Sequence, residues 1–314
     1  MANMMILTVT PNSALDKVLF IQKWVPGGTM RTEKTVTSVG GKGLDSSVVL
    51  RHLGVETVGL TFVAGRTGYE LIHLLEKYGI IPEVVWVGGK TRVAYVVSEA
   101  QHERHSHLIT GKLNINPTQV EEFLQRFRHR VREAAWVICA GSLPLNLPVT
   151  FYRTIIEEAK QYHVPVLLDS SGKAVEEAIP ACPEILKMNR EEFERTFNLP
   201  CSNLEDLKQQ ADQVYRTYNL PSLVITCASN GILSYSQGGT FHTRAPRQKP
   251  VNAAGAGDAV SSALVWRLSQ GDSWRDALKW VGATAAAVVL TEGTADCHMQ
   301  DILRILPQVK IDEI

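Results

Sequence analysis

The sequence predicts an α/β fold in which helices cover both faces of a mainly parallel central sheet, with a small β-sheet attached as a lid. Short apolar segments rich in β-branched residues alternate with longer segments of helical periodicity, a pattern typical of strands joined by crossover helices. Two stretches, 17–39 and 83–110, show strand-like alternation without intervening helices. Because they share this pattern although they lie far apart, we expect them to pair as the lid; an irregular surface excursion is the alternative.

The elements follow one another with the spacing of βαβ units. The predicted strands are the apolar segments 5–10, 58–63, 136–139, 164–169, 184–188 and 223–227. The predicted crossover helices are 44–52, 69–78, 118–130, 148–162, 190–197 and 204–218. A hairpin over 231–244 turns at a Gln-Gly-Gly sequence, and two helices over 256–269 and 274–290 follow it. We expect one domain over residues 1–314, with the lid at about 17–39 and 83–110.

The composition is that of an ordinary globular protein: 314 residues, 45% hydrophobic and 20% charged, with 32 basic residues against 32 acidic ones. Because the formal charge is zero, the overall electrostatics do not favour binding to nucleic acid or to an anionic membrane. No apolar run reaches the roughly 18 to 20 residues that cross a bilayer, and the first residues lack the features of a secretion signal. We therefore expect a cytoplasmic protein whose partners are small molecules.

The cysteine pattern excludes two further classes of protein. The five cysteines are odd in number and no two form a C-x-x-C pair, which argues against a disulfide framework and against a zinc site. We expect reduced thiols that pack in the core. A nucleophilic role for Cys227, which follows a predicted buried strand, is the alternative.

The strongest local motif is VNAAGAGD at residues 251–258, directly before a long helical segment. Small residues where a loop enters a helix let backbone N–H groups surround an anion, and the helix dipole adds to the attraction. In the first turn of that helix, the Asp258 carboxylate can accept the proton of an attacking hydroxyl. The motif therefore predicts a phosphate site with an adjacent base; a glycine-rich turn capped by Asp258 is the alternative.

A second glycine loop, VGGKG at residues 39–43, precedes an apolar helix and carries Lys42. Its spacing matches neither the P-loop G-x-x-x-x-G-K-S/T nor the dinucleotide-binding G-x-G-x-x-G, so neither of those folds is supported. Taken alone, the loop is equally consistent with ordinary turn chemistry.

Taken together and in order, several segments resemble the PfkB family of carbohydrate kinases, within the ribokinase-like superfamily. They are TPNSALD at 10–16, GGKG at 40–43, TR at 91–92, GSLP at 141–144, DSSG at 169–172, KMNREE at 187–192, NAAGAGD at 252–258 and GT at 293–294. The chain is most similar to the group of 1-phosphofructokinases and tagatose-6-phosphate kinases. The resemblance covers nearly the whole chain and implies a ribokinase-like three-layer α/β/α sandwich with a β-sheet lid.

The resemblance also implies a catalytic centre. Asp258 would remove the proton from the acceptor hydroxyl, and backbone amides would stabilise the charge that develops on the transferred phosphoryl group. The residues that supply these amides are Gly255, Ala256 and Gly257. Catalysis would then depend on positioning and electrostatics.

The implied cofactors are ATP, as co-substrate, and Mg²⁺. The resemblance places Mg²⁺ near Asn189 and Glu192, through water, which suits an ion that gives up its hydration reluctantly. Helix capping by Asn189 with a solvated Glu192 is the alternative. The implied nucleotide-binding residues are Lys187, Thr226, Asn230, Gly231, Ala254 and Gly257.

The implied acceptor site comprises Asn12, Asp16, Gly40, Gly41, Lys42, Asp45, Arg92 and Ser142. Asp16 matches a carboxylate that holds sugar hydroxyls, since an ionised acid accepts hydrogen bonds from neighbouring OH groups. Lys42 and Arg92 resemble the pair that contacts the phosphate of a sugar phosphate. The alternative for Arg92 is an exposed charge on a lid strand.

Three departures from the family pattern affect the predicted acceptor. Asp45 stands where the family carries Asn, and we expect its charge to repel a phosphate about 6 Å away by on the order of 3 kcal/mol unless Lys42 or Arg92 compensates. Ala94 replaces another Asn, and the lid turn QHERHSH at 101–107 is unusual; we expect a solvated turn from which Arg104 or His105 reaches the substrate. Ala253 replaces a common Thr and leaves the amide cradle unchanged.

The sequence thus predicts an ATP-dependent kinase that phosphorylates a hydroxyl group of a sugar phosphate, of the phosphofructokinase or tagatose-6-phosphate kinase type. A kinase for an unphosphorylated sugar, polyol or nucleoside is the main alternative, because Asp45 disfavours a phosphate. A non-catalytic sugar- or nucleotide-binding protein is a further alternative, although binding alone would not require Asp258. By resemblance, we expect a homodimer formed through the lid.

Overall fold

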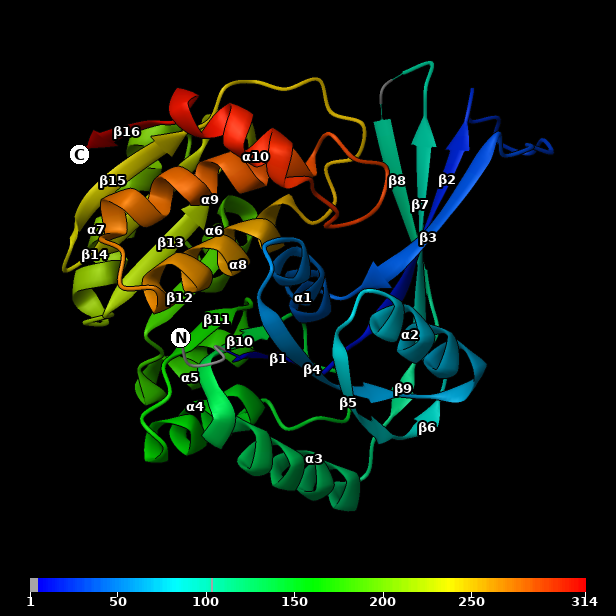
Figure 1. Ribbon diagram of the computed structural model, residues 1–314, viewed down its shortest axis with the longest axis horizontal. Coiled ribbons are helices and arrows are strands. Elements are labelled where there is room, and N and C mark those ends of the chain that lie inside the picture. The colour runs from blue at the N-terminus through cyan, green and yellow to red at the C-terminus, as the bar shows by residue number, and fades with distance from the viewer. Residues whose placement is uncertain (1–4, 103) are drawn as a thin grey trace.

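A computed structural model describes residues 5–102 and 104–314 as an α/β body with a separate small sheet at one side (Figure 1). Within these residues the large sheet has the order β16-β15-β14-β13-β12-β11-β10-β1-β4-β5. Its strands are β1 (Met5–Thr10), β4 (Glu56–Val63), β5 (Ile81–Trp86), β10 (Ala134–Ala140), β11 (Val166–Asp169), β12 (Ile185–Asn189), β13 (Ser222–Thr226), β14 (Ile232–Ser236), β15 (Gly239–Arg244) and β16 (Lys310–Glu313). From β5 through β13 the neighbouring strands are parallel, and the last three are antiparallel.

The centre of the sheet is β1, which pairs in parallel with β4 on one side and β10 on the other. All six of its residues are buried. Leu7 and Val9 face one hydrophobic core and Ile6 faces another, as expected for a strand that is buried on both faces. The alternation along β1 therefore divides the interior into two layers.

Helices from different parts of the chain fill these two layers. The first layer holds α3 (Pro117–Arg130), α4 (Phe151–Gln161), α5 (Lys173–Ala178), α6 (Arg190–Phe197) and α7 (Leu204–Thr217). The second holds α1 (Lys42–His52), α2 (Gly65–Lys77), α8 (Ala256–Ser269), α9 (Trp274–Val288) and α10 (Met299–Ile305). The predicted fold class, a three-layer α/β/α sandwich with a mainly parallel sheet and a smaller sheet, is confirmed.

The small sheet, called the lid below, has the order β3-β2-β7-β8. Its strands are β2 (Ala14–Ile21), β3 (Lys34–Gly40), β7 (Arg92–Glu99) and β8 (Arg104–Thr110). Of the stretch 83–110, the part up to Trp86 lies in the large sheet, because β5 pairs in parallel with β4. A further two-residue pair, β6 (Gly88–Gly89) with β9 (Leu113–Asn114), connects the two regions.

Side chains from the two sequence segments meet inside the lid, since β2 and β7 are parallel neighbours with Asp16 beside Ala94 and Ala14 beside Arg92. On its other side β2 pairs antiparallel with β3, which places Asp16 beside Ser38 and Ala14 beside Gly40. The lid thereby holds Asp16 and Arg92 next to the glycine loop that begins α1. No helix among the described residues is both long and apolar enough to cross a membrane.

Candidate active site

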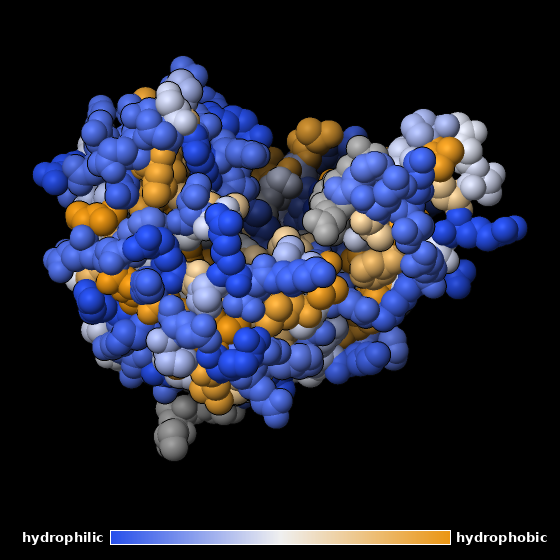
Figure 2. Space-filling view, turned by 90° about the horizontal axis from the view of Figure 1, so that it is seen from above, coloured by the Kyte–Doolittle hydropathy of each residue, from blue (hydrophilic) through white to orange (hydrophobic). Residues whose placement is uncertain are grey.

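The carboxyl ends of the parallel strands converge on one edge of the large sheet, where ligands bind in open α/β folds. Asp169 ends β11, Asn189 ends β12 and Thr226 ends β13. In register, Asp169 lies beside Lys187 and Asn189 beside Thr226. Figure 2 shows that the molecular surface is hollowed between the large body and the lid.

The N-terminus of α8 forms an open cradle for an anion. Gly255 caps the helix with a φ of 87°, and a side chain there would clash with the backbone of Ala295. By contrast, a Cβ on Gly257 would meet nothing closer than the Lys187 Nζ at 3.8 Å. The first amides of α8 therefore face a lysine across open space, an arrangement that favours a phosphate.

The loop before α8 is held by Asn252, a residue that the sequence analysis did not select. Its Oδ1 accepts a hydrogen bond from the Ala254 N–H at 3.0 Å, and its Nδ2 donates to the Glu292 carbonyl at 3.1 Å. The Ala295 N–H donates in turn to the Ala254 carbonyl at 3.2 Å. These bonds fix the cradle against the loop that carries Thr294.

Asp169 forms the centre of the charged network below the cradle. It is fully buried; its Oδ1 lies 3.0 Å from Lys42 Nζ and its Oδ2 lies 2.5 Å from Lys187 Nζ. Lys42 Nζ also contacts the Glu192 carboxylate at 2.7 Å, and the Ser261 hydroxyl of α8 donates to Asp169 Oδ2 at 3.2 Å. The Asp169 carboxylate of β11 therefore connects residues of α1, β12 and α8, and Lys42 extends the network to Glu192 of α6.

The network decides the charge of its members. Desolvation by burial opposes ionisation of Asp169, but Lys187 and Lys42 outweigh it and lower the pKa of Asp169 to about 2. Desolvation likewise opposes the charge of Lys42, and the carboxylates of Asp169, Glu192 and Asp258 overcome this and raise the pKa of Lys42. Asp169 and Lys42 therefore both stay charged beside the cradle.

Asp258 lies in the first turn of α8 and is 7% exposed. Desolvation by burial and the nearby Asp169 charge raise the pKa of Asp258 to about 7, against the opposing effect of Lys187 and Lys42. A carboxyl group with a pKa close to neutrality suits general base catalysis, because it can both accept and release a proton. This placement agrees with the predicted role.

Asp16 lies at the acceptor end of the site. The Thr294 hydroxyl donates a hydrogen bond to Asp16 Oδ2 at 3.0 Å, and a side chain on Gly40 would clash with Asp16 Oδ1. Desolvation by burial raises the pKa of Asp16 to about 6, although Thr294 and the Arg92 charge oppose the shift. Gly40 is thus required by the close approach of this carboxylate, and Thr294 connects it to the loop behind the cradle.

The remaining predicted acceptor residues surround Asp16. The Asn12 Nδ2 donates to the Ser142 hydroxyl at 3.0 Å, and Arg92 donates to the Asn12 carbonyl at 2.6 Å. Arg92 is half-buried and lies close enough to Asp16 to influence its charge. It is therefore a partly buried charge beside Asp16, in contrast to the alternative of an exposed charge on the lid. Gly41 caps α1 with a φ of 102°.

Lys42 does not lie with Arg92, as the resemblance to a phosphate-binding pair implied. Its ammonium group is engaged by Asp169 and Glu192, on the side of the cradle. The residue begins α1, and its side chain reaches toward the sheet because both carboxylates attract it there. Lys42 thus shares the Asp169 carboxylate with Lys187.

The expected charge of Asp45 also requires correction. The side chain is 5% exposed, and desolvation by burial, followed by the charges of Asp258 and Asp16, raises the pKa of Asp45 well above its ordinary value. Burial thereby favours the neutral acid. The repulsion that a fixed negative charge would exert on an acceptor phosphate is correspondingly weakened.

The predicted magnesium residues form a helix cap. The Asn189 side chain accepts from the Glu192 N–H at 2.8 Å, and the Glu192 carboxylate accepts from the Asn189 N–H at 2.9 Å. The other Glu192 oxygen pairs with Lys42, so Glu192 is held in place and not solvated as the alternative required. The part of the chain that the structure describes contains no cluster of three or more His, Cys, Asp or Glu side chains suited to direct metal ligation.

The predicted nucleotide residues lie on adjoining strand ends. Thr226 ends β13, and Asn230 and Gly231 follow in the turn before β14. Gly231 has a φ of 92°, and a side chain there would clash with the Thr243 carbonyl, so the hairpin itself explains this glycine. The Asn230 carbonyl lies 2.6 Å from His242 Nε2.

At the lid turn, the described contact lies at its base. His102 Nδ1 lies 2.7 Å from the Glu99 carboxylate, at the base of the turn. The hypothesis that Arg104 or His105 reaches the substrate concerns side chains outside the described residues. The five cysteines are free thiols, and burial raises the pKa of Cys227, which disfavours the thiolate that a nucleophilic role requires.

A family model described as pfkB family carbohydrate kinase matches residues 12–301. The chain belongs to this family. It is therefore a carbohydrate kinase, a phosphotransferase that acts on an alcohol group with ATP as co-substrate. Its family membership and its kinase activity, both predicted from the sequence, are confirmed.

Named relatives match along almost the whole kinase. A 1-phosphofructokinase of Bacillus subtilis is 26% identical over 313 residues, which is 99% of this chain and 100% of the relative. An ATP-dependent 6-phosphofructokinase isozyme 2 of Escherichia coli is 23% identical over 96% of this chain and 97% of the relative.

Solved structures support the fold. A structure of phosphofructokinase-2 from Escherichia coli in complex with substrates and products matches with a TM-score of 0.87 and 21% identity, over 96% of this chain and 98% of that one. A ribokinase from Thermotoga maritima matches with a TM-score of 0.76 and 20% identity, over 97% and 99%. The ribokinase-like fold is thereby confirmed.

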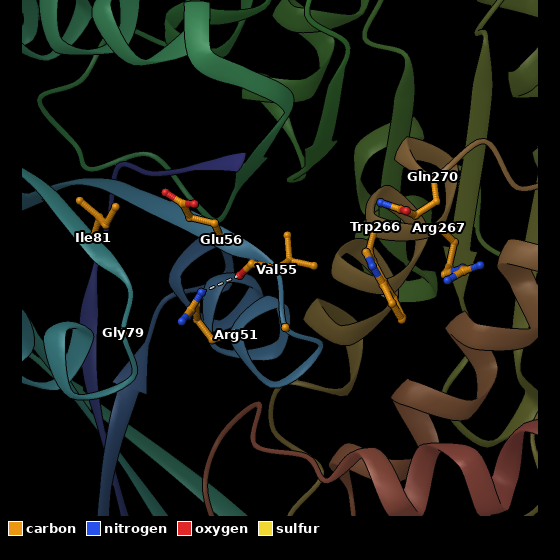
Figure 3. Close-up of a pocket in the computed structure, with 9 residues that line it drawn as sticks. Arg51, Val55, Glu56, Gly79, Ile81, Trp266, Arg267 and Gln270 are labelled. Atoms are coloured by element: carbon orange, nitrogen blue, oxygen red, sulfur yellow. Dashed lines mark hydrogen bonds between the residues drawn. The ribbon is translucent and has the colours of Figure 1, made fainter. Parts of the chain in front are cut away.

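A further pocket of the kinase lies away from this chemistry. It has a volume of about 570 Å³ and is lined by Arg51, Glu56, Trp266 and Arg267, among others (Figure 3). Arg51 lies in the last turn of α1, about 14 Å along the helix axis from Lys42, and Arg267 lies near the end of α8. This pocket is therefore at the opposite end of both helices and cannot hold the reacting groups.

Three residues of the site were missed by the sequence analysis. Asp169 directly follows an apolar strand segment, so its position at a strand's carboxyl end was a usable signal. Asn252 belongs to the glycine motif, where its side chain was available for loop capping. Thr294 belongs to the GT motif at 293–294, but its partner could not be predicted, because the contact with Asp16 joins residues 278 positions apart.

Proposed function

We propose that this kinase transfers the terminal phosphoryl group of ATP to a hydroxyl of a ketose phosphate, as its phosphofructokinase relatives do by name. The observation that carries the proposal is the position of Asp258: it lies in the first turn of α8, at the anion cradle, and it is close to Asp45, as Asp16 is on the acceptor side. One face of the site is suited to phosphate and the other to hydroxyl groups.

Asp258 acts as the base. In its ionised form it accepts the proton of the acceptor hydroxyl as the oxygen attacks phosphorus, and the product is a neutral carboxyl group. Burial places its pKa near 7, so a substantial fraction is ionised at neutral pH. Asp16 accepts hydrogen bonds from neighbouring hydroxyls and thereby orients the attacking one.

The cradle and the two lysines stabilise the phosphate charge. The first amides of α8 donate to oxygens of the transferred group, and Lys42 and Lys187 lie beside them as fixed positive charges. Because Asp169 holds both lysines before substrate binds, little reorganisation is needed during the reaction.

The kinase's residues fit Mg²⁺ held through water. Glu192 and Asn189 offer hard oxygen atoms, yet their hydrogen bonds and the Lys42 ion pair already position these groups, which favours contact through coordinated water. When bound, Mg²⁺ would neutralise charge on the phosphate oxygens.

The acceptor profile tests the proposal. We expect ADP formation from ATP with fructose 1-phosphate, fructose 6-phosphate or tagatose 6-phosphate, because Arg92 faces the acceptor pocket and burial weakens the charge of Asp45. Free sugars, polyols and nucleosides are the comparison set. Turnover confined to these uncharged acceptors would contradict the proposal. Such a result would agree with the ion pair of Lys42 with Glu192, which keeps this lysine away from an acceptor phosphate.

Replacement of Asp258 by Asn tests the base. We expect kcat to fall by about 10²- to 10⁴-fold, while ATP binding measured by calorimetry is retained. For the unmodified enzyme, kcat/KM for the acceptor rises with pH through an apparent pKa near 7, since only the ionised carboxyl accepts a proton. Turnover of the Asn variant within threefold of the original would remove Asp258 from this role.

We also propose a homodimer formed through the lid. The support is β8, an edge strand that exposes Leu108 (52%) and Ile109 (60%), an apolar pair unusual on an unpaired sheet edge. Sedimentation velocity should give twice the chain mass, and Leu108→Lys with Ile109→Lys should give the monomer. A monomeric original protein at micromolar concentration would contradict this assembly.

A further inference from the structure

Asp45 occupies an unusual environment for an acidic residue. It lies in the first turn of α1 and is 5% exposed, and its own backbone N–H is used by the helix, donating to the Gly41 carbonyl at 2.9 Å. Within the described chain, its Oδ1 is buried and has no hydrogen-bond partner. A buried polar atom without a partner costs free energy, so its retention requires an explanation.

The surroundings of Asp45 are acidic. Asp16 on β2 and Asp258 on α8 both lie close enough to disfavour the ionisation of Asp45. The Tyr78 phenol after α2 is also close, since a charge on Asp45 would contribute to raising the pKa of Tyr78. The cation on its own helix, Lys42, is held by Asp169 and Glu192. Arg92, whose charge acts on Asp16, donates to the Asn12 carbonyl.

Two other polar atoms at this end of the site are also buried without a hydrogen-bond partner. Thr10 Oγ1 and Arg92 Nε are buried and, among the residues the structure describes, lack a partner. Thr10 lies against the glycine loop that begins α1, since a side chain on Gly43 would clash with its hydroxyl. Three of the eight buried polar atoms that lack a partner among the described residues therefore lie where the lid meets the start of α1.

We propose that Asp45 is a specificity-determining residue that acts as a neutral carboxylic acid and donates a hydrogen bond to an oxygen of the acceptor. The inference rests on the proposed function, because it assigns this end of the site to the acceptor. A protonated carboxyl group is a donor through its O–H, whereas the ionised Asp16 beside it is only an acceptor. Asp45 would then donate to an oxygen lone pair of a polyhydroxy compound, and Asp16 would accept the proton of a neighbouring hydroxyl.

The neutral form also serves the two other carboxyl groups. A proton held on Asp45 removes one of three negative charges, which makes ionisation of Asp16 and of the base Asp258 easier. It also spares an acceptor phosphate the repulsion of a fixed charge. Asp45 thereby supports binding and proton acceptance without contacting the phosphoryl group.

The kinetic test compares three variants over pH 6 to 9. Asp45→Leu, which has a similar shape and no donor, should raise the acceptor KM about 10-fold or more with little change in the KM for ATP. As the pH increases, the original enzyme should lose the O–H donor of Asp45, whereas the amide of Asp45→Asn keeps its donor at every pH. The ratio of the acceptor KM of the original enzyme to that of Asp45→Asn should therefore rise with pH. Asp301→Asn, on the surface beside Arg304, is the matched control and should leave both values unchanged.

A thermal test does not depend on turnover. The unfolded chain ionises Asp45 above about pH 4, while the folded chain keeps the proton, so folding stability falls as the pH rises. Asp45→Asn has no such loss, and its Tm should exceed that of the original protein by at least about 4 °C at pH 8, with the gap closing toward pH 4. Asp301→Asn should not reproduce this pattern.

The outcomes separate the inference from the proposed function. If the Tm of the original protein and that of Asp45→Asn depend on pH in the same way, the claim that Asp45 is protonated fails. If the acceptor KM of Asp45→Leu is unchanged, the claim that Asp45 donates a hydrogen bond to the acceptor fails. If no ketose phosphate is turned over, the proposed function fails, but the Tm comparison still tests the protonation of Asp45, and the KM comparison is made with whichever acceptor the panel identifies.

Discussion

The arrangement of the site depends on the contact between the buried Asp169 carboxylate and two lysines. Lys42 comes from the helix that follows the lid, and Lys187 comes from the neighbouring strand, so one group fixes parts of the chain far apart in sequence. Buried ion pairs contribute little net stability because desolvation offsets their attraction. Their value here is positional, because they hold two positive charges beside the N-terminus of α8 before phosphate arrives.

The site has a positively charged side and an acidic side. The cradle side combines helix dipole and lysines, whereas the acceptor side carries the carboxyl groups of Asp16, Asp45 and Asp258, all with raised pKa values. Burial is the largest cause in each case; it raises the pKa of Asp16 to about 6 and that of Asp258 to about 7, and it favours the neutral form of Asp45. A surface suited to phosphate thereby lies next to one suited to hydroxyls, which is what phosphoryl transfer to an alcohol requires.

Local signals predicted much of this structure, while distant contacts were not predictable. The helices Arg190–Phe197 and Ala256–Ser269 and the strand Met5–Thr10 have the predicted bounds, because capping residues and apolar runs define them locally. The short helix α5 and the half-exposed edge strand β5 lacked a strong pattern and were not predicted as elements of the body. At the site, the motifs located Asp258, but the charge of Asp45 and the partners of Lys42 depend on burial and on residues from other segments.

Replacement of Asp169 by Asn is the most direct test of the central claim. The amide keeps the shape of the side chain but removes the charge that holds Lys42 and Lys187. With circular dichroism confirming the fold, the account predicts a fall in kcat of about 100-fold or more, comparable to the loss of a preorganised donor in other active sites. A kcat within threefold of the original enzyme would contradict it, since the lysines would then not depend on Asp169 for their catalytic position.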